Sequence, residues 1–169
     1  MNIHIKIHVI VIIAFLMCSS NTGISQGIKK NAIYVSLGAF SFSGNYTNYT
    51  ATYERMINPR ILNKNISSFI KVGFGGTALT GGTHFLGGRV KPENGKYVYT
   101  QLGILIGANH IKLEMGLGTT RYVSGYWESD GFLPALNMGW RYQDPGGNFI
   151  FRLGASFPEL VYASVGFYF

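Results

Sequence analysis

Residues 161–169 end the chain and read Val-Tyr-Ala-Ser-Val-Gly-Phe-Tyr-Phe, a strict alternation between two kinds of side chain. The odd positions, from Val161 to Phe169, are all apolar, whereas the even positions are tyrosine, serine or glycine. A period of two residues is typical of a β-strand, because successive side chains point to opposite faces of a sheet. Residues 149–157 repeat the alternation, and Asp-Pro-Gly-Gly at 144–147 precedes them. Since proline and glycine favour turn dihedrals, these segments predict antiparallel strands joined by tight turns.

The same alternation continues backwards through the chain and predicts eight strands. We expect them at residues 32–42, 49–57, 66–77, 98–107, 110–123, 133–143, 149–157 and 161–169. The segment 78–97 is long, polar and rich in glycine, and it could hold a short extra hairpin. Eight is an even number, so both chain ends fall on the same side, where the connections are mostly short. The sequence therefore predicts an all-β fold, an eight-stranded antiparallel up-and-down barrel with meander topology.

The two faces of the predicted strands differ in polarity. One face carries valine, leucine, isoleucine, phenylalanine and tryptophan without a mid-strand charge, whereas the other collects glycine and charged residues. The charged residues are Glu54, Lys71, Glu114, Arg141 and Arg152. A lysine or arginine that faces lipid at mid-depth costs about 2–4 kcal/mol, so we expect these charges to face inward. The lumen of eight strands is just wide enough for side chains, which predicts a structural charge network in the interior of a transmembrane barrel.

The composition agrees with a surface in contact with lipid. Charged residues make up 12% of the chain, about half of the roughly 25% found in soluble domains. Beyond the first 25 residues, no stretch of about 20 apolar residues could form a spanning helix. Several aromatic residues near strand ends on the apolar face form a predicted aromatic girdle. These are Tyr49, Tyr53, Trp140, Tyr142 and Phe169.

The first 25 residues have the features of a secretory signal peptide. Lys6 supplies a positive charge, residues 9–17 form a short apolar run, and Gly23 and Ser25 fit the small positions before a cleavage site. We expect residues 1–25 to be removed after export by the Sec route, which leaves 26–169 as the barrel domain. A retained N-terminal anchor is the alternative.

Cys18 is the only cysteine of the chain. It could be the lipidated residue of a lipoprotein signal, although Met17 is not the small residue that such a signal requires before the cysteine. Otherwise Cys18 leaves with the signal peptide. The mature chain then has no thiol, which excludes disulfides, thiolate catalysis and cysteine metal sites.

The whole-chain plan resembles the small eight-stranded outer-membrane barrels of the OmpA-like or OmpX-like family, over roughly residues 32–169. In that family, a terminal aromatic residue preceded by apolar residues at alternate positions is the signal read by the barrel-assembly machinery. Val165, Phe167 and Phe169 match this signal. The resemblance implies a place in the outer membrane of a Gram-negative cell, both termini in the periplasm and contact with outer-membrane lipids. It is uninformative about activity.

Three functional hypotheses follow from these observations. The first is a non-enzymatic barrel with a structural, envelope or surface-interaction role, whose extracellular loops bind an unidentified surface ligand. The second is a lipid A acyl-modifying enzyme, for which His84, Ser129 and Asp130 could form a hydrolase triad, although they come from separate loops and geometry defines a triad. The third is a narrow channel through the lumen.

The sequence shows no motif for binding a metal, a cofactor or a nucleic acid. We find no metal-ligand spacing and no phosphate-binding loop, so no cofactor and no metal are predicted. The net charge of +7 comes from scattered lysines and arginines, so we predict no interface with nucleic acid. His110 lies at a predicted turn and is expected to be an interfacial residue.

Overall fold

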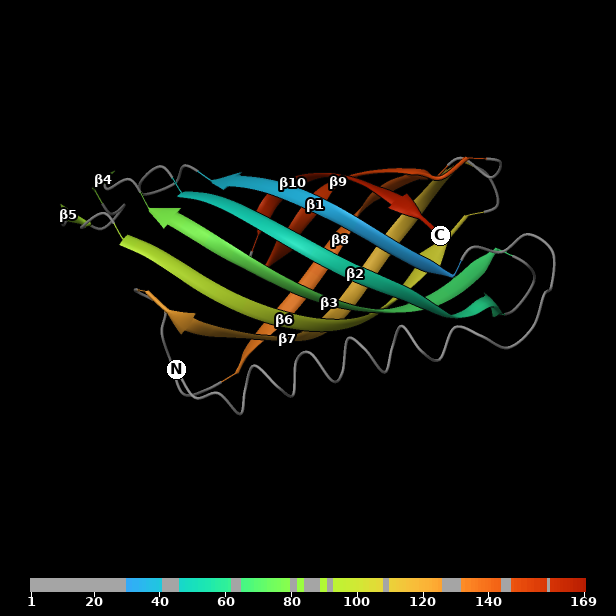
Figure 1. Cartoon of the computed structure of the whole chain (residues 1–169), viewed down its shortest axis with the longest axis horizontal. Helices are drawn as coiled ribbons and strands as arrows, with labels where there is room; N and C mark the ends of the chain where they lie inside the picture. The colour runs from blue at the N-terminus through green and yellow to red at the C-terminus, as the bar shows by residue number, and fades with distance from the viewer. Residues whose placement is uncertain are drawn as a thin grey trace.

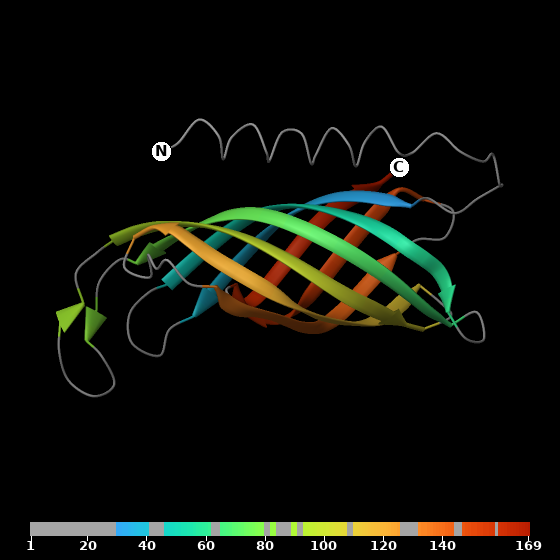
Figure 2. The ribbon, with the colours of Figure 1, turned by 90° about the horizontal axis from the view of Figure 1, so that it is seen from below.

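Eight strands close into a single antiparallel barrel, shown from two sides in Figures 1 and 2. The structure is a computed structural model, and it describes residues 30–40, 46–61, 65–79, 82–83, 89–90, 93–107, 110–125, 132–143, 147–157 and 159–169. The barrel strands are β1 (Asn31–Phe40), β2 (Tyr46–Ile61), β3 (Ile66–Leu79), β6 (Glu93–Ile106), β7 (Ile111–Ser124), β8 (Leu133–Gln143), β9 (Phe149–Phe157) and β10 (Leu160–Tyr168). Each strand pairs with the next one of these along the chain, and β1 closes on β10. The predicted eight-stranded meander is therefore confirmed.

The first and the last strand meet at one end of the barrel. The amide of Asn31 donates a hydrogen bond to the carbonyl of Phe169 (3.2 Å), and the amide of Phe169 donates one back to the carbonyl of Asn31 (3.0 Å). We call this the terminal end of the barrel. The opposite end, at which β3 connects to β6, is the loop end.

Several strands continue further toward the loop end than the apolar alternation predicted. β6 begins at Glu93 instead of residue 98, and β3 and β6 stay paired as far as Leu79 opposite Glu93. The expected extra hairpin in this segment consists of β4 (Gly82–Thr83) and β5 (Arg89–Val90), beyond the loop-side ends of β3 and β6 in Figure 1. Backbone hydrogen bonds do not require apolar side chains, so strand pairing can continue beyond the residues that show the apolar alternation.

The inner face of the barrel is packed through pairs of glycines and large rings. A Cβ atom on Gly73 would lie 2.2 Å from Cε1 of Tyr99, and one on Gly75 would lie 2.6 Å from Cζ of Tyr97. The two hydroxyl groups reach over β3 to threonines of β2, Tyr97 to Thr50 and Tyr99 to Thr52, each at 2.7 Å. The glycines on the inner face therefore provide the space that the aromatic rings occupy.

Two groups of sequence predictions concern residues outside the described part of the chain. The signal peptide, including Cys18, falls within residues 1–29. The candidate triad residues His84, Ser129 and Asp130 also lie outside the described part of the chain. Among the described segments, none is a helix long and apolar enough to cross a membrane.

The glycine–ring packing yields a stability prediction. We expect Gly73→Ala to destabilise the barrel by about 1–3 kcal/mol, because the added methyl group overlaps the Tyr99 ring. In the double variant Gly73→Ala/Tyr99→Leu, the two losses should be clearly less than additive, since the smaller side chain relieves the overlap. Urea unfolding of the refolded protein measures all three free energies. Strictly additive losses would contradict the packing described above.

Candidate functional site in the lumen and on the outer wall

The five charged residues expected on the inner face all lie buried inside the barrel. Their exposed fractions are between 0 and 2%, and they come from five different strands. They are Glu54 on β2, Lys71 on β3, Glu114 on β7, Arg141 on β8 and Arg152 on β9.

Glu114 is the centre of this charge network. Its Oε1 accepts hydrogen bonds from Lys71 Nζ (2.9 Å) and Asn137 Nδ2 (2.8 Å). Its Oε2 accepts hydrogen bonds from Arg141 Nε and Arg152 Nε, both at 2.9 Å. Arg152 makes a second, bidentate contact through Nη2 to Oε1. One carboxylate therefore holds three cations from three other strands, which compensates for the cost of burying the charges.

Arg141 connects this centre to the opposite wall of the barrel. Its Nη1 donates to Glu54 Oε1 (2.7 Å) and to the hydroxyl of Tyr168 (3.0 Å). Glu54 and Arg141 are 87 positions apart in the sequence. The network thus joins β2, β7, β8 and β10 across the lumen.

Aromatic rings surround the cations of the network. The Phe69 ring centroid lies 5.3 Å from Lys71 Nζ and 5.5 Å from Arg141 Cζ. Arg152 lies 4.3 Å from the ring centroid of Tyr34 and 5.0 Å from that of Tyr162. Such contacts favour a cation in a site shielded from water. Sequence reasoning did not single out these rings or Asn137, although their inward parity was available as a signal.

Side chains also occupy the lumen on both sides of the charges. Toward the terminal end, Met56, Phe69 and Leu105 form a buried apolar cluster. Toward the loop end, a second cluster contains Tyr97, Tyr99, Tyr122 and Ala135. In the residues that the structure describes, the lumen is thus lined by packed side chains above and below the ion pairs.

The outer wall shows the opposite polarity. Large apolar side chains point outward around the whole barrel, with Leu37, Leu117 and Phe167 exposed to 67, 66 and 64%. The residues expected in the aromatic girdle and in the assembly signal lie on this wall. Tyr53 is half-buried and donates a hydrogen bond to Asn31 Oδ1 (2.8 Å), and the others are exposed: Tyr49, Trp140, Tyr142, Val165, Phe167 and Phe169.

Three of the charged side chains that the structure describes on the barrel strands share the outward face. Arg55 lies toward the terminal end, opposite Asn31. Lys96 and Arg121 lie toward the loop end of β6 and β7. All three are basic and flank the apolar belt, so the described side chains agree with the expectation of an apolar face without a mid-strand charge.

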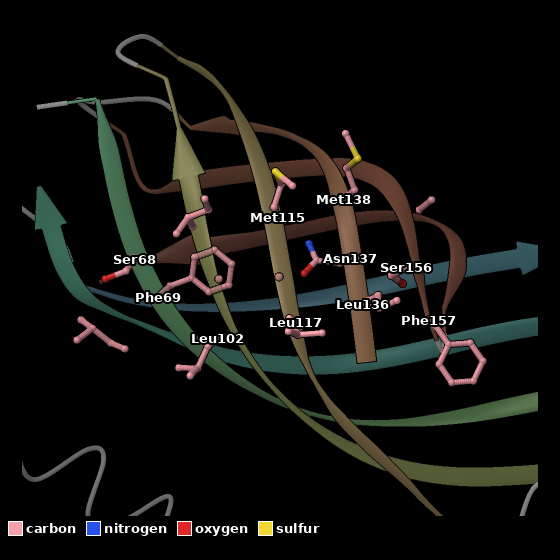
Figure 3. Close-up of a pocket in the computed structure, with 15 residues that line it drawn as sticks. Ser68, Phe69, Leu102, Met115, Leu117, Leu136, Asn137, Met138, Ser156 and Phe157 are labelled. Atoms are coloured by element: carbon pink, nitrogen blue, oxygen red, sulfur yellow. The ribbon is translucent and has the colours of Figure 1, made fainter. Parts of the chain in front are cut away.

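A shallow apolar groove of about 970 Å³ crosses the outer wall, and Figure 3 shows its lining. Its middle is formed by outward side chains of β6, β7 and β8, namely Leu102, Ile104, Met115, Leu117, Leu136 and Met138. Gly103 and Gly116, which face each other on β6 and β7, also line it. A Cβ atom at either position would point into the lumen, toward the Phe69 ring for Gly103 and toward the Asn137 side chain for Gly116.

The described residues hold no arrangement suited to metal binding, since no group of three or more histidine, cysteine, aspartate or glutamate side chains is close enough. His110 is exposed at the terminal end, where its ring stacks on Tyr142 with centroids 5.9 Å apart. Its role as an interfacial residue stays a prediction.

No protein-family model and no curated protein matches this sequence. One similar solved structure is that of Ail, the attachment invasion locus protein of Yersinia pestis, in complex with the heparin analogue sucrose octasulfate. It is 15% identical with a TM-score of 0.47, and the match covers 84% of this chain and 100% of that one. Another is the de novo designed protein TMB2.3, 16% identical with a TM-score of 0.44, covering 86% of this chain and 97% of the design. At this level of identity, the likeness concerns the fold alone.

The central position of Glu114 yields a second stability prediction. We expect Glu114→Gln to destabilise the barrel by about 3–5 kcal/mol, because three buried cations lose their common counter-charge. The matched control is Glu159→Gln. Glu159 is also buried, but it accepts a hydrogen bond from the neutral Ser156 Oγ (2.9 Å) instead of pairing with three cations. The free energy of unfolding should therefore fall by about 1 kcal/mol or less in this variant. Equal losses in urea unfolding would contradict the central role of Glu114.

Proposed function

We propose that this protein is an integral outer-membrane β-barrel with a filled lumen, which serves a structural or surface-interaction role through its loops. Under this proposal the terminal end faces the periplasm and the loop end faces outward. The observation that carries the proposal is the inverted polarity of the barrel, with charges buried inside and large apolar side chains outside.

The magnitude of the outer apolar surface supports membrane insertion. Soluble monomers rarely expose contiguous apolar patches larger than a few hundred Å², whereas here every barrel strand contributes outward apolar side chains. A closed barrel also pairs its backbone groups between strands, which hydrocarbon requires because it offers no hydrogen bonds. Both features fit a lipid environment.

The edges of the apolar belt support the same placement. Outward aromatic residues lie toward both ends of the barrel, for example Tyr142 near the terminal end and Phe132 at the loop end. The cation Arg55 lies toward the terminal end and Lys96 and Arg121 toward the loop end, at the level expected for lipid phosphates. The outward row Val165, Phe167 and Phe169 on the last strand is also accessible to an assembly machinery that reads this edge.

The content of the lumen favours a structural barrel over a channel. Arg141 spans the interior between Glu54 and Glu114, and packed clusters lie above and below it. An eight-stranded barrel leaves little space beyond its own side chains. We therefore assign the interaction role to the loops and the stabilising role to the lumen.

Membrane placement is tested by moving a charge onto the outer wall. We expect Val35→Arg, at the middle of β1, to destabilise the barrel in lipid bilayers by about 2–4 kcal/mol, and Val123→Arg, at the loop edge of β7, by about 0–1 kcal/mol. If the wall faced water instead of lipid, each substitution would change the free energy of unfolding by about 0.5 kcal/mol or less. Urea unfolding in vesicles gives the two values. A negligible effect of Val35→Arg would contradict insertion.

The filled lumen predicts an absence of conduction. In planar bilayers, the refolded wild-type protein should give no reproducible conductance steps, because the buried ion pairs and the two clusters occupy the interior. Insertion is verified in parallel by protease protection of the barrel. Reproducible steps from the wild-type protein would contradict the structural role and favour the channel hypothesis.

A further inference from the structure

We propose that the outer wall over β6, β7 and β8 is a binding site for an anionic diacyl lipid. Its phosphate would contact Lys96 and Arg121, and an acyl chain would lie in the apolar groove below them. This inference rests on the proposed membrane placement and adds a specific lipid partner to it.

Two cations lie together at the loop edge of this wall. Arg121 is opposite Val98 in the β6–β7 register, and Lys96 precedes Val98 by two positions on β6, beyond a register shift between Lys96 and Tyr97. Both side chains reach the surface at the loop end of these two paired strands, and both are long enough to approach one phosphate from neighbouring strands. The guanidinium of Arg121 also lies 6.0 Å from the ring centroid of Phe132, an exposed aromatic residue at the same end of the barrel.

A pair of hydroxyl groups comes next along the same strands. Thr100 and Thr119 face each other across β6 and β7, and their Oγ1 atoms are 3.5 Å apart on the exposed side. Hydroxyls at this depth can donate to the ester carbonyls that follow the phosphate in a diacyl lipid. The wall thus changes from cationic to hydroxylic before it becomes apolar.

The apolar groove begins directly below the threonines. Leu102 lies opposite Leu117, which in turn lies opposite Leu136, and Met115 lies opposite Met138. Figure 3 shows these side chains around the groove, with the two methionines on neighbouring strands. Leucine and methionine side chains are flexible apolar groups that adapt to an acyl chain.

The order of these three layers argues for a lipid as the occupant. Cations, hydroxyls and an apolar groove follow one another down one pair of strands, in the order of phosphate, ester and acyl chain. Among the described outward side chains of β6, β7 and β8, the charged ones are Lys96 and Arg121, both basic. This charge complementarity selects an anionic lipid over a neutral one.

The methionine methyl groups provide the test. The protein is labelled with ¹³C-methyl methionine and inserted into phosphatidylcholine nanodiscs, to which phosphatidylglycerol or phosphatidylcholine with the same spin-labelled acyl chain is added. We expect phosphatidylglycerol to broaden the Met115 and Met138 signals more strongly than phosphatidylcholine does. The buried Met56 methyl, inside the lumen, is the internal control.

Charge variants identify the headgroup contact. Each removed cation should lower the preference for phosphatidylglycerol over phosphatidylcholine about fivefold. In the double variant Lys96→Gln/Arg121→Gln, phosphatidylglycerol should therefore broaden the Met115 and Met138 signals no more than phosphatidylcholine does. The matched control Lys30→Gln removes an exposed lysine at the terminal end, on the edge of β1, and should leave the preference unchanged.

The outcomes separate this inference from the proposed function. Equal broadening by the two lipids, or a preference that survives the double variant, would overturn the anionic lipid site while leaving membrane insertion intact. Absence of broadening by either lipid at Met115 and Met138 would mean that the outer wall does not face acyl chains. That result would overturn the proposed membrane placement and the lipid site with it.

Discussion

The carboxylate of Glu114 is the interaction on which the interior of this barrel depends. Three cations and an amide from other strands converge on its two oxygens, and Arg141 continues the network to Glu54 on the far wall. Charges without water are stable only when they are paired and hydrogen-bonded. The network therefore favours one register of the strands, since a slip by one residue would turn each charge to the outer wall.

The remaining interior is organised around these charges by size. Glycines on the inner face, such as Gly73, Gly75 and Gly103, leave the space that aromatic rings need, and the rings in turn cover the cations. A small lumen cannot hold a large side chain at every inward position. Alternation of glycine with tyrosine, phenylalanine and arginine is thus the packing solution of this barrel.

The outer wall follows a separate rule, in which polarity changes with height. The middle is apolar, the edges carry aromatic residues, and the outward cations Arg55, Lys96 and Arg121 flank the belt. This gradient matches the profile of a bilayer from hydrocarbon to phosphate. Along β6 and β7, cations, hydroxyl groups and apolar side chains follow one another on neighbouring residues. This order corresponds to the parts of one lipid molecule, from phosphate to acyl chain.

The sequence by itself determined the number of barrel strands, their approximate bounds and the inward direction of five charged side chains, because side-chain direction in a strand depends only on position parity. Glu54, Lys71, Glu114, Arg141 and Arg152 were recognisable in this way. Only the tertiary structure decided that Glu114 is the centre, that Tyr34, Phe69 and Tyr162 cover the cations, and that Lys96 stands above a groove. Contacts across a closed barrel depend on strand stagger, which joins residues as distant as Glu54 and Arg141, and no local pattern encodes that stagger.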